Sequence, residues 1–244
     1  MRLEISALST LPEIRPGDDL GALLREASSR EQAQIDRSVI LAVAQKIVSK
    51  AENAIVDLRE VRPSATAQSW ARDWNKDPRL IELILSQSKR IVKMDRGVII
   101  VETSHGFVCA NAGVDQSNTE SDDFATILPK DPDASARALR EALGCGAVIV
   151  TDTFGRPWRE GLVDIAIGVS GLDAVEDWRG RADRRGRKLA GTIIAVADQL
   201  AAAAGLLMAK AGGRPAVLFR GFEWQGAEGS ARKLIRKPEE DLFR

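Results

Sequence analysis

The order of apolar and polar residues along the chain predicts a series of short strands and helices. Residues 3–8 alternate between the two classes, and residues 39–44 form a continuous β-compatible apolar run, so both segments are predicted strands and the second is expected to be buried. An aspartate pair at 18–19 is suited to cap a helix between them. The buried strand is expected to place Lys50 at or just beyond its end.

The middle of the chain is predicted to hold two helices followed by three strands. Residues 64–75 and 77–88 are the helices, and the second carries apolar residues at spacings of three and four. Apolar runs at 91–94, 98–101 and 107–110 are separated by very short turns. These three strands are therefore expected to be antiparallel neighbours.

A further helix and strand follow. Asp131 and Pro132 form a favourable cap and first-turn pair for a helix that ends near Gly144. Residues 147–150 then predict another buried strand. A polar loop is expected to begin directly at the end of that strand, from Thr151.

The last third of the chain predicts strands at 162–169 and 216–219, with a basic loop at 179–188 and an alanine-rich helix at 192–211 between them. Residues 201–205 carry so little bulk that another backbone can approach closely, at the centre of the fold or in a second subunit. Because strands and helices do not alternate regularly, the pattern favours an α+β fold with mixed, largely antiparallel sheets and flanking helices over a Rossmann sheet.

Length and composition indicate a folded globular protein. A chain of 244 residues fits one domain, residues 1–244, or two closely packed lobes. Hydrophobic residues make up 44% of it and charged residues 29%, which is enough for both a core and a solvated surface. The 35 basic residues balance the 35 acidic ones, so no global field attracts nucleic acid or a membrane, and any anion site must be built locally.

The sequence also predicts a cytoplasmic location. The two cysteines, Cys109 and Cys145, form no disulfide framework and no CxxC spacing. Charged residues near the N-terminus leave no room for the apolar core of a signal peptide. The longest apolar stretch is interrupted by Asp198 and Gln199, which argues against a membrane span.

Familiar nucleotide and metal motifs are absent from the sequence. There is no P-loop, and the start of a dinucleotide fingerprint at Gly144 and Gly146 has Ile149 where its third glycine belongs. His105 is the only histidine, so HExxH sites are excluded and a multi-histidine site would need another subunit. Any metal must therefore be held mainly by oxygen.

The first candidate for such chemistry is the segment 105–118. A predicted strand ends here in a turn of small residues that bears Asp115, Ser117 and Asn118. Carboxylate, hydroxyl and amide oxygens are the ligands that magnesium and manganese prefer. The alternative is an Asx-type turn with solvated side chains.

The second candidate is the segment 151–161, which again begins at a predicted strand end. Asp152 and Thr153 could ligate a metal there, while the arginines of the segment grip phosphate or carboxylate. The alternative is a surface loop in which Trp158 packs and the arginines are solvated. Two oxygen-rich segments at strand ends make a shared site more plausible than either alone.

Basic residues offer two weaker candidates. Lys50 could neutralise a nucleotide phosphate, although a lone lysine is more often merely exposed. The basic run 179–188 is compatible with an anion- or RNA-binding module, but it lacks the interleaved aromatic residues that are typical of one. A solvated or inter-subunit loop is the simpler interpretation of that run.

Taken in order, segments along essentially the whole chain resemble the coenzyme F420:L-glutamate ligase family. The runs NAGVD at 111–115 and TDTFGRPWR at 151–159 are long and specific. The matching segments are residues 11–14, 17–19, 47–52, 105–118, 151–161, 195–198 and 238–244.

The resemblance implies roles for individual residues. Asp115 and Asp152 occupy the positions of catalytic carboxylates and, with Thr153, of metal ligands. Two positions depart from the family: Gln45 stands where a small hydroxyl residue is expected, and Lys210 where some members carry glutamine. The implied GTP contacts are Leu11, Pro12, Glu13, Ile14, Gln45, Lys50 and Asn118.

The resemblance also implies an activity and an assembly. It is the GTP-dependent addition of L-glutamate to the deazaflavin coenzyme precursor F420-0, by an amide bond formed through an acyl phosphate. The implied cofactor is a divalent cation, manganese or magnesium, with potassium as a further candidate. The implied fold is an intertwined homodimer, without the C-terminal flavin-binding domain that some members carry.

Some alternatives stay open at this point. Arg156 would help to hold anionic groups, and His105 is either a proton acceptor for the amine or a structural hydrogen-bonding residue. A metal-dependent phosphohydrolase would use the same carboxylates. An RNA-binding module centred on residues 179–188 is the non-enzymatic alternative.

Overall fold

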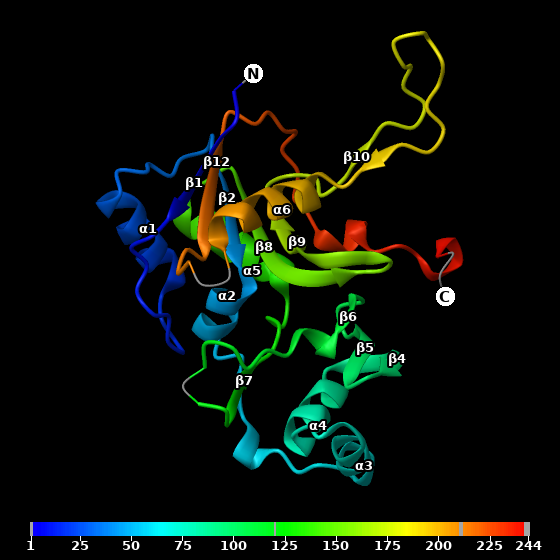
Figure 1. Ribbon diagram of the computed structural model, residues 1–244. Coiled ribbons are helices and arrows are strands. Elements are labelled where there is room, and N and C mark those ends of the chain that lie inside the picture. The colour runs from blue at the N-terminus through cyan, green and yellow to red at the C-terminus, as the bar shows by residue number, and fades with distance from the viewer. Residues whose placement is uncertain (1, 120, 210–211, 242–244) are drawn as a thin grey trace.

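The computed structural model describes residues 2–119, 121–209 and 212–241, and its largest element is a five-stranded mixed sheet (Figure 1). The strands lie in the order β1-β12-β2-β8-β9, and only the β2–β8 pair is parallel. Their bounds are β1 Glu4–Leu8, β12 Ala216–Arg220, β2 Ile40–Ala44, β8 Ala147–Arg156 and β9 Arg159–Ser170.

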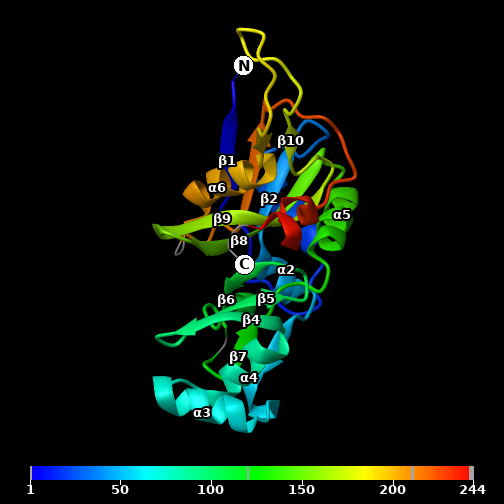
Figure 2. The ribbon, with the colours of Figure 1, turned by 90° about the vertical axis from the view of Figure 1, so that its right-hand side faces the viewer.

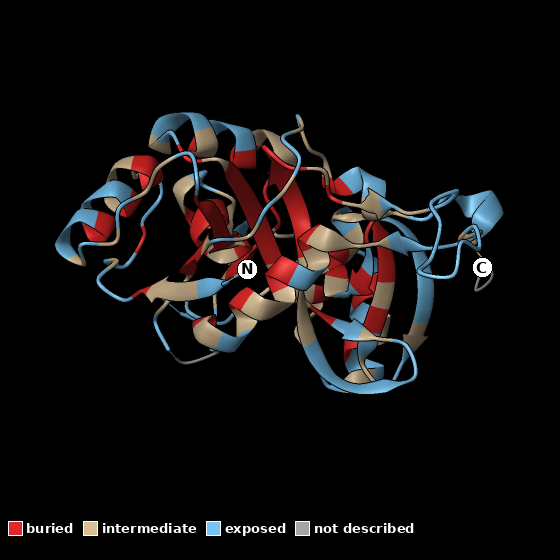
Figure 3. Cartoon of the chain, turned by 90° about the horizontal axis from the view of Figure 1, so that it is seen from above, coloured by how far each residue is buried: buried red, intermediate tan, exposed pale blue. Residues whose placement is uncertain are grey.

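Helices cover both faces of this sheet. In Figure 2, α5 (Pro132–Leu143) and α6 (Val196–Met208) lie on opposite sides of it, and α1 (Leu20–Arg30) packs beside α5. The predicted caps are confirmed: the Asp19 and Asp131 carboxylates accept hydrogen bonds from first-turn N–H groups of α1 and α5. The central strands β2 and β12 are almost wholly buried in the main core, as the red strands of Figure 3 show.

The middle of the chain forms a smaller region with its own apolar clusters, below the main sheet in Figure 1. Its helices are α3 (Ala65–Trp74) and α4 (Pro78–Ser86), and its three consecutive strands pair antiparallel, as predicted. These strands are β4 Ser88–Asp95, β5 Val98–Thr103 and β6 Val108–Ala110; β3 Ile55–Asp57 pairs with β7 Phe124–Thr126. Single-turn 3₁₀ helices occur at Leu58–Glu60, Asn111–Gly113, Ala231–Leu234 and Pro238–Glu240.

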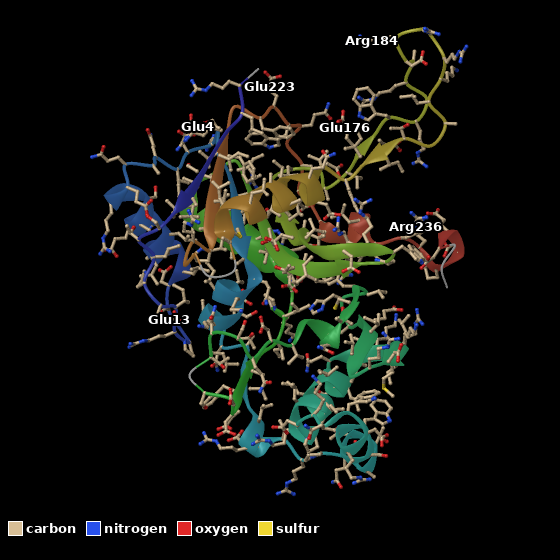
Figure 4. The ribbon with its side chains drawn as sticks, viewed as in Figure 1. Glu4, Glu13, Glu176, Arg184, Glu223 and Arg236 are labelled. Carbon is tan, nitrogen blue, oxygen red and sulfur yellow. The ribbon has the colours of Figure 1, made fainter. Side chains whose placement is uncertain are left out.

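The predicted basic loop is confirmed as a loop that projects from the molecule between two short strands, β10 (Glu176–Asp177) and β11 (Ile193–Ile194) (Figure 1). Acidic residues compensate part of its charge, because Arg179 pairs with Asp177 and Arg181 with Glu176. Figure 4 shows Arg184 at its tip. The helix predicted from residue 192 begins later, at Val196, since β11 pairs with β10 first.

The prediction of a polar loop from Thr151 is wrong. Strand β8 continues to Arg156 and forms a hairpin with β9, in which Asp152 pairs with Ile165 and Thr153 with Asp164. Cross-strand hydrogen bonds stabilise this polar stretch as a strand although its sequence is not apolar.

A β-bulge interrupts the hairpin just before the polar stretch. Val150 pairs with Gly168 but Thr151 pairs with Ala166, so β9 carries one extra residue there. The Asp198 carboxylate of α6 accepts a hydrogen bond from the Ala166 N–H at 2.9 Å. Burial raises the pKa of Asp198, and this hydrogen bond offsets part of that effect.

Lys50 does not lie at a strand end, and that prediction is wrong too. The chain turns directly from β2 into helix α2 (Gln45–Ala51), and Lys50 lies in its last turn, buried. The α+β fold with mixed and antiparallel sheets is otherwise as expected. Among the described helices, none combines the length and apolar character that crossing a membrane requires.

Candidate functional site

A cavity of about 740 Å³ opens beside the main sheet, where β2 ends and β8 continues beyond it into the hairpin with β9. Because these strands are parallel neighbours with Ala44 opposite Thr151, the residues that follow β2 lie beside the part of β8 that begins at Asp152. The ten residues that the family resemblance assigned to nucleotide or metal binding all line this cavity: Leu11, Pro12, Glu13, Ile14, Gln45, Lys50, Asp115, Asn118, Asp152 and Thr153.

One wall is formed by residues 11–14 and helix α2. Lys50 forms an ion pair with Glu13, and its side chain is 9% exposed whereas that of Glu13 is 73% exposed. Figure 4 shows Glu13 beside α2. Gln45 is buried and accepts a hydrogen bond from the Ser49 hydroxyl at 2.8 Å. The ion pair thus connects two segments that are 37 residues apart in the chain.

Asp115 lies on a second wall, where its backbone bridges Thr126. Its carboxylate accepts hydrogen bonds from the Ser117 N–H at 2.7 Å and the Ser117 hydroxyl at 3.0 Å, so the Asx-type turn weighed as an alternative is present. Lys46 Nζ lies 2.8 Å from the same carboxylate. Burial would raise the pKa of Asp115, but the Lys46 and Ser117 contacts outweigh it and hold that pKa below its usual value.

Asp152 and Thr153 come from strand β8. The Thr153 N–H donates to Asp152 Oδ1 at 2.8 Å, and the Thr153 hydroxyl donates to Asp164 Oδ1 of β9 at 2.5 Å. Behind them, burial and the charge of Asp152 raise the pKa of Cys109 to about 12, so this thiol stays protonated and is not a nucleophile.

The oxygen donors suit a hard divalent cation. Two carboxylates, a threonine hydroxyl and the Asn118 amide face one cavity, and none of these groups is a soft ligand. In the described part of the chain, no three acidic, cysteine or histidine side chains gather closely enough to hold an ion by themselves. A cation here would need water or substrate oxygens as well, which is the usual way in which magnesium binds with phosphates.

Three charged residues of the cavity were not identified from the sequence: Lys46, Asp164 and Arg214. With them, the described lining holds the acidic residues Glu13, Asp115, Asp152 and Asp164 and the basic residues Lys46, Lys50 and Arg214. The cavity is therefore a mixed-charge site suited to a complex of phosphates with a cation.

Other sequence candidates lie elsewhere. His105 Nε2 contacts the carbonyl oxygens of Pro129 at 2.9 Å and Lys130 at 3.2 Å, which fits the structural role that was weighed for it. The Arg156 guanidinium donates to the Glu160 carbonyl within its own hairpin, and Trp158 is 81% exposed. None of the three lines the cavity. Lys210 is outside the described residues.

Comparison with known proteins identifies the family of this chain. The sequence model of the family F420-0:Gamma-glutamyl ligase matches residues 9–221. The chain is 44% identical to the coenzyme F420:L-glutamate ligase of Methanothermobacter thermautotrophicus over 100% of both chains, and 45% identical to that of Methanopyrus kandleri over 99% of this chain and 98% of the other. The ligase of Archaeoglobus fulgidus is 41% identical, over 100% of this chain and 97% of the other. The chain therefore belongs to the F420-0:gamma-glutamyl ligase family.

Proposed function

We propose that this protein carries out the reaction of its family, the addition of L-glutamate to F420-0, with GTP as the co-substrate. The observation that carries the proposal is the convergence of residues 11–14, Lys50, Asn118, Asp115 and Asp152 on one cavity in a chain of this family. These residues come from separate segments, and a ligase must bring a nucleotide, an acceptor and an amine together.

The reaction balances without an enzyme nucleophile. An F420-0 carboxylate oxygen attacks the γ-phosphorus of GTP, and GDP leaves with the electron pair of the broken P–O bond. The amine of glutamate then attacks the acyl carbon, phosphate leaves and the amine gives up a proton. In both steps negative charge develops on the reacting oxygen atoms, so positioning and charge neutralisation supply most of the catalysis.

The chain's own residues would divide this work. Residues 11–14, Gln45, Lys50 and Asn118 would bind GTP, and the cationic side chains of Lys46, Lys50 and Arg214 would face its phosphates. Here Arg214 takes the part first considered for Arg156, since it lines the cavity and Arg156 does not.

Asp115, Asp152 and Thr153 would hold manganese or magnesium, with potassium as an additional cation. When bound, the divalent ion neutralises phosphate oxygens. In the protein without a bound cation, the Lys46 ammonium neutralises the charge of the Asp115 carboxylate. Cation binding at Asp115 is therefore expected to loosen this ion pair.

We also propose a homodimer. Trp158, Leu162 and Leu206 are 81%, 63% and 81% exposed, and Leu162 and Leu206 belong to β9 and α6, which pack against each other. Such large apolar side chains in water commonly mark an interface. Because Leu162 and Leu206 also line the cavity, a partner bound there would approach the site.

Glutamate-dependent nucleotide turnover tests the proposed function. The purified chain is incubated with F420-0, GTP, manganese and glutamate, and the products are read by mass spectrometry. GDP should form in step with the addition of glutamate to F420-0, and ATP should substitute poorly. Equal GTP consumption without glutamate and F420-0 would instead favour the phosphohydrolase.

The RNA-binding alternative has a separate test. If the projecting loop at 179–188 bound RNA, affinity for a single-stranded RNA oligomer would fall steeply with salt concentration. Because Asp177 and Glu176 neutralise two arginines of the loop, we expect weak RNA binding at every salt concentration.

A further inference from the structure

Asp164 is directly opposite Thr153 in the β8–β9 hairpin, on the wall of the cavity. Side chains that pair in this way lie on the same face of a sheet, close enough to interact. The Thr153 hydroxyl uses this proximity to donate a hydrogen bond to Asp164 Oδ1 at 2.5 Å. Asp164 is therefore bound to a residue that is proposed to hold the cation.

The direction of this hydrogen bond determines what Thr153 can offer to the cavity. A threonine hydroxyl has one proton and two lone pairs, and a carboxylate can only accept. With its proton directed at Asp164, the Thr153 oxygen presents lone pairs to the cavity. A cation requires such an orientation, and carboxylates next to metal ligands commonly impose it.

Helix α6 restricts the position of Asp164 from the other side. A Cβ atom at Gly205 would lie 2.5 Å from Asp164 Oδ2, closer than real Cβ atoms come, and 3.0 Å from its Cγ. Gly205 also lines the cavity. The carboxylate is thus held between Thr153 and the backbone of α6, and only glycine leaves room for it there.

We propose that Asp164 is a positioning residue of the ligase site. It acts through Thr153, whose hydroxyl it orients toward the cation, and Gly205 permits this arrangement. The inference rests on the proposed role of Thr153 as a cation ligand. It adds two residues, one on β9 and one on α6, to those that the family resemblance assigned.

Manganese affinity, measured by calorimetry on the full chain, tests the proposal with four variants. Thr153→Val and Asp164→Ala should each weaken binding about tenfold or more, the usual effect of losing a ligand or its orienting partner. Asp164→Asn should keep most of the affinity, because its amide oxygen still accepts the hydroxyl proton. The double variant Thr153→Val/Asp164→Ala should bind no more weakly than Thr153→Val alone.

Gly205→Ala provides a test that removes no polar group. It should weaken manganese binding in the otherwise native chain, because the added methyl displaces the Asp164 carboxylate. In an Asp164→Ala background the same change should have no further effect on affinity. Ala203→Gly on the same helix is the matched control and should leave affinity unchanged. Thermal melting of every variant checks that it folds.

Three results would overturn the proposal. Additive losses in the double variant would mean that Asp164 acts independently of Thr153, and the proposed function would stand. Equal losses in Asp164→Asn and Asp164→Ala would assign the effect to charge rather than orientation. Wild-type affinity in Thr153→Val would show that Thr153 is no ligand, which removes a part of the proposed function together with this inference.

Discussion

Lys50 is a buried charge in the cavity wall, and its replacement tests nucleotide binding at the scale of one residue. Lys50→Met keeps the alkyl chain but removes the ammonium. Because a hydrogen bond to a charged group contributes about 1.5–3 kcal/mol, GTP affinity should fall about ten- to a hundredfold. Stability should change little, because the Glu13 partner is 73% exposed and such ion pairs contribute about 0–1 kcal/mol.

Calorimetric titration with GTP measures this effect, and thermal melting controls for folding. Lys93→Met is a matched control, because Lys93 is exposed on β4 and lies outside the cavity lining. If Lys50→Met binds GTP as tightly as the Lys93→Met control, Lys50 has no part in nucleotide binding.

Residues of the site differ in how far the sequence could reveal them. Asp115 and Asn118 lie together in a polar turn after an apolar strand, and that contrast is visible in the sequence. Asp164 stands alone on a strand, and Lys46 and Arg214 are isolated charges that are usually solvated. Only the pairing of β8 with β9, of β2 with β8 and of β12 with β2 brings these three residues to the cavity.

At the scale of elements, the two errors of sequence interpretation share a cause. Helix α2 spans only Gln45–Ala51, too short to show a helical period, so its residues resembled the end of a strand. The stretch 151–156 is largely polar and is followed by Pro157, which indicates a loop, yet β9 pairs with residues 151–156. In both segments tertiary contacts outweigh local pattern, and both segments form walls of the cavity.

The turn between β6 and Asp115 supports a second prediction. Gly113 has φ +70°, and a Cβ there would lie 2.7 Å from Leu128 side-chain atoms. Gly113→Ala should therefore lower the free energy of unfolding by about 2–4 kcal/mol, the sum of backbone strain and overpacking. It should also weaken manganese binding, because the turn positions Asp115.

Urea unfolding compares this variant with Gly144→Ala. Gly144 has φ +66° but no atoms within 4 Å of an added Cβ, so its replacement should cost only the backbone term of about 1 kcal/mol. Equal destabilisation of the two variants would contradict the packing of Leu128 against Gly113.

At the scale of the whole molecule, apolar patterning predicted most strands but not their order. The first and last strands, β1 and β12, are neighbours, and β12 separates β1 from β2. Pairing between segments so distant in the chain depends on the assembled core. The alternation of apolar and polar residues along a strand does not reveal which strand it pairs with. The α+β class could therefore be predicted, whereas the edge of the sheet that holds the cavity could not.

The exposed apolar face on β9 and α6 supports a third prediction, for assembly. The wild-type chain should sediment as a dimer, and Leu206→Glu should sediment as a monomer, because a charge at an apolar interface is costly to desolvate. Its melting temperature should stay close to that of an isolated subunit, since Leu206 is 81% exposed. Val92→Glu, on exposed β4, is the control and should remain dimeric. A wild-type monomer would refute this assembly.

The central claim is that Asp115, which follows β6, and Asp152, which lies in β8, serve one cation in one cavity. Replacing either by asparagine keeps its size but removes the charge that hard cations need. The direct test is calorimetric titration of manganese, with and without GTP, into the wild type, Asp115→Asn and Asp152→Asn, with thermal melting as the folding control. Both variants should fold and lose manganese binding. If either variant binds manganese and GTP like the wild type, that aspartate is not a ligand and the shared site is wrong.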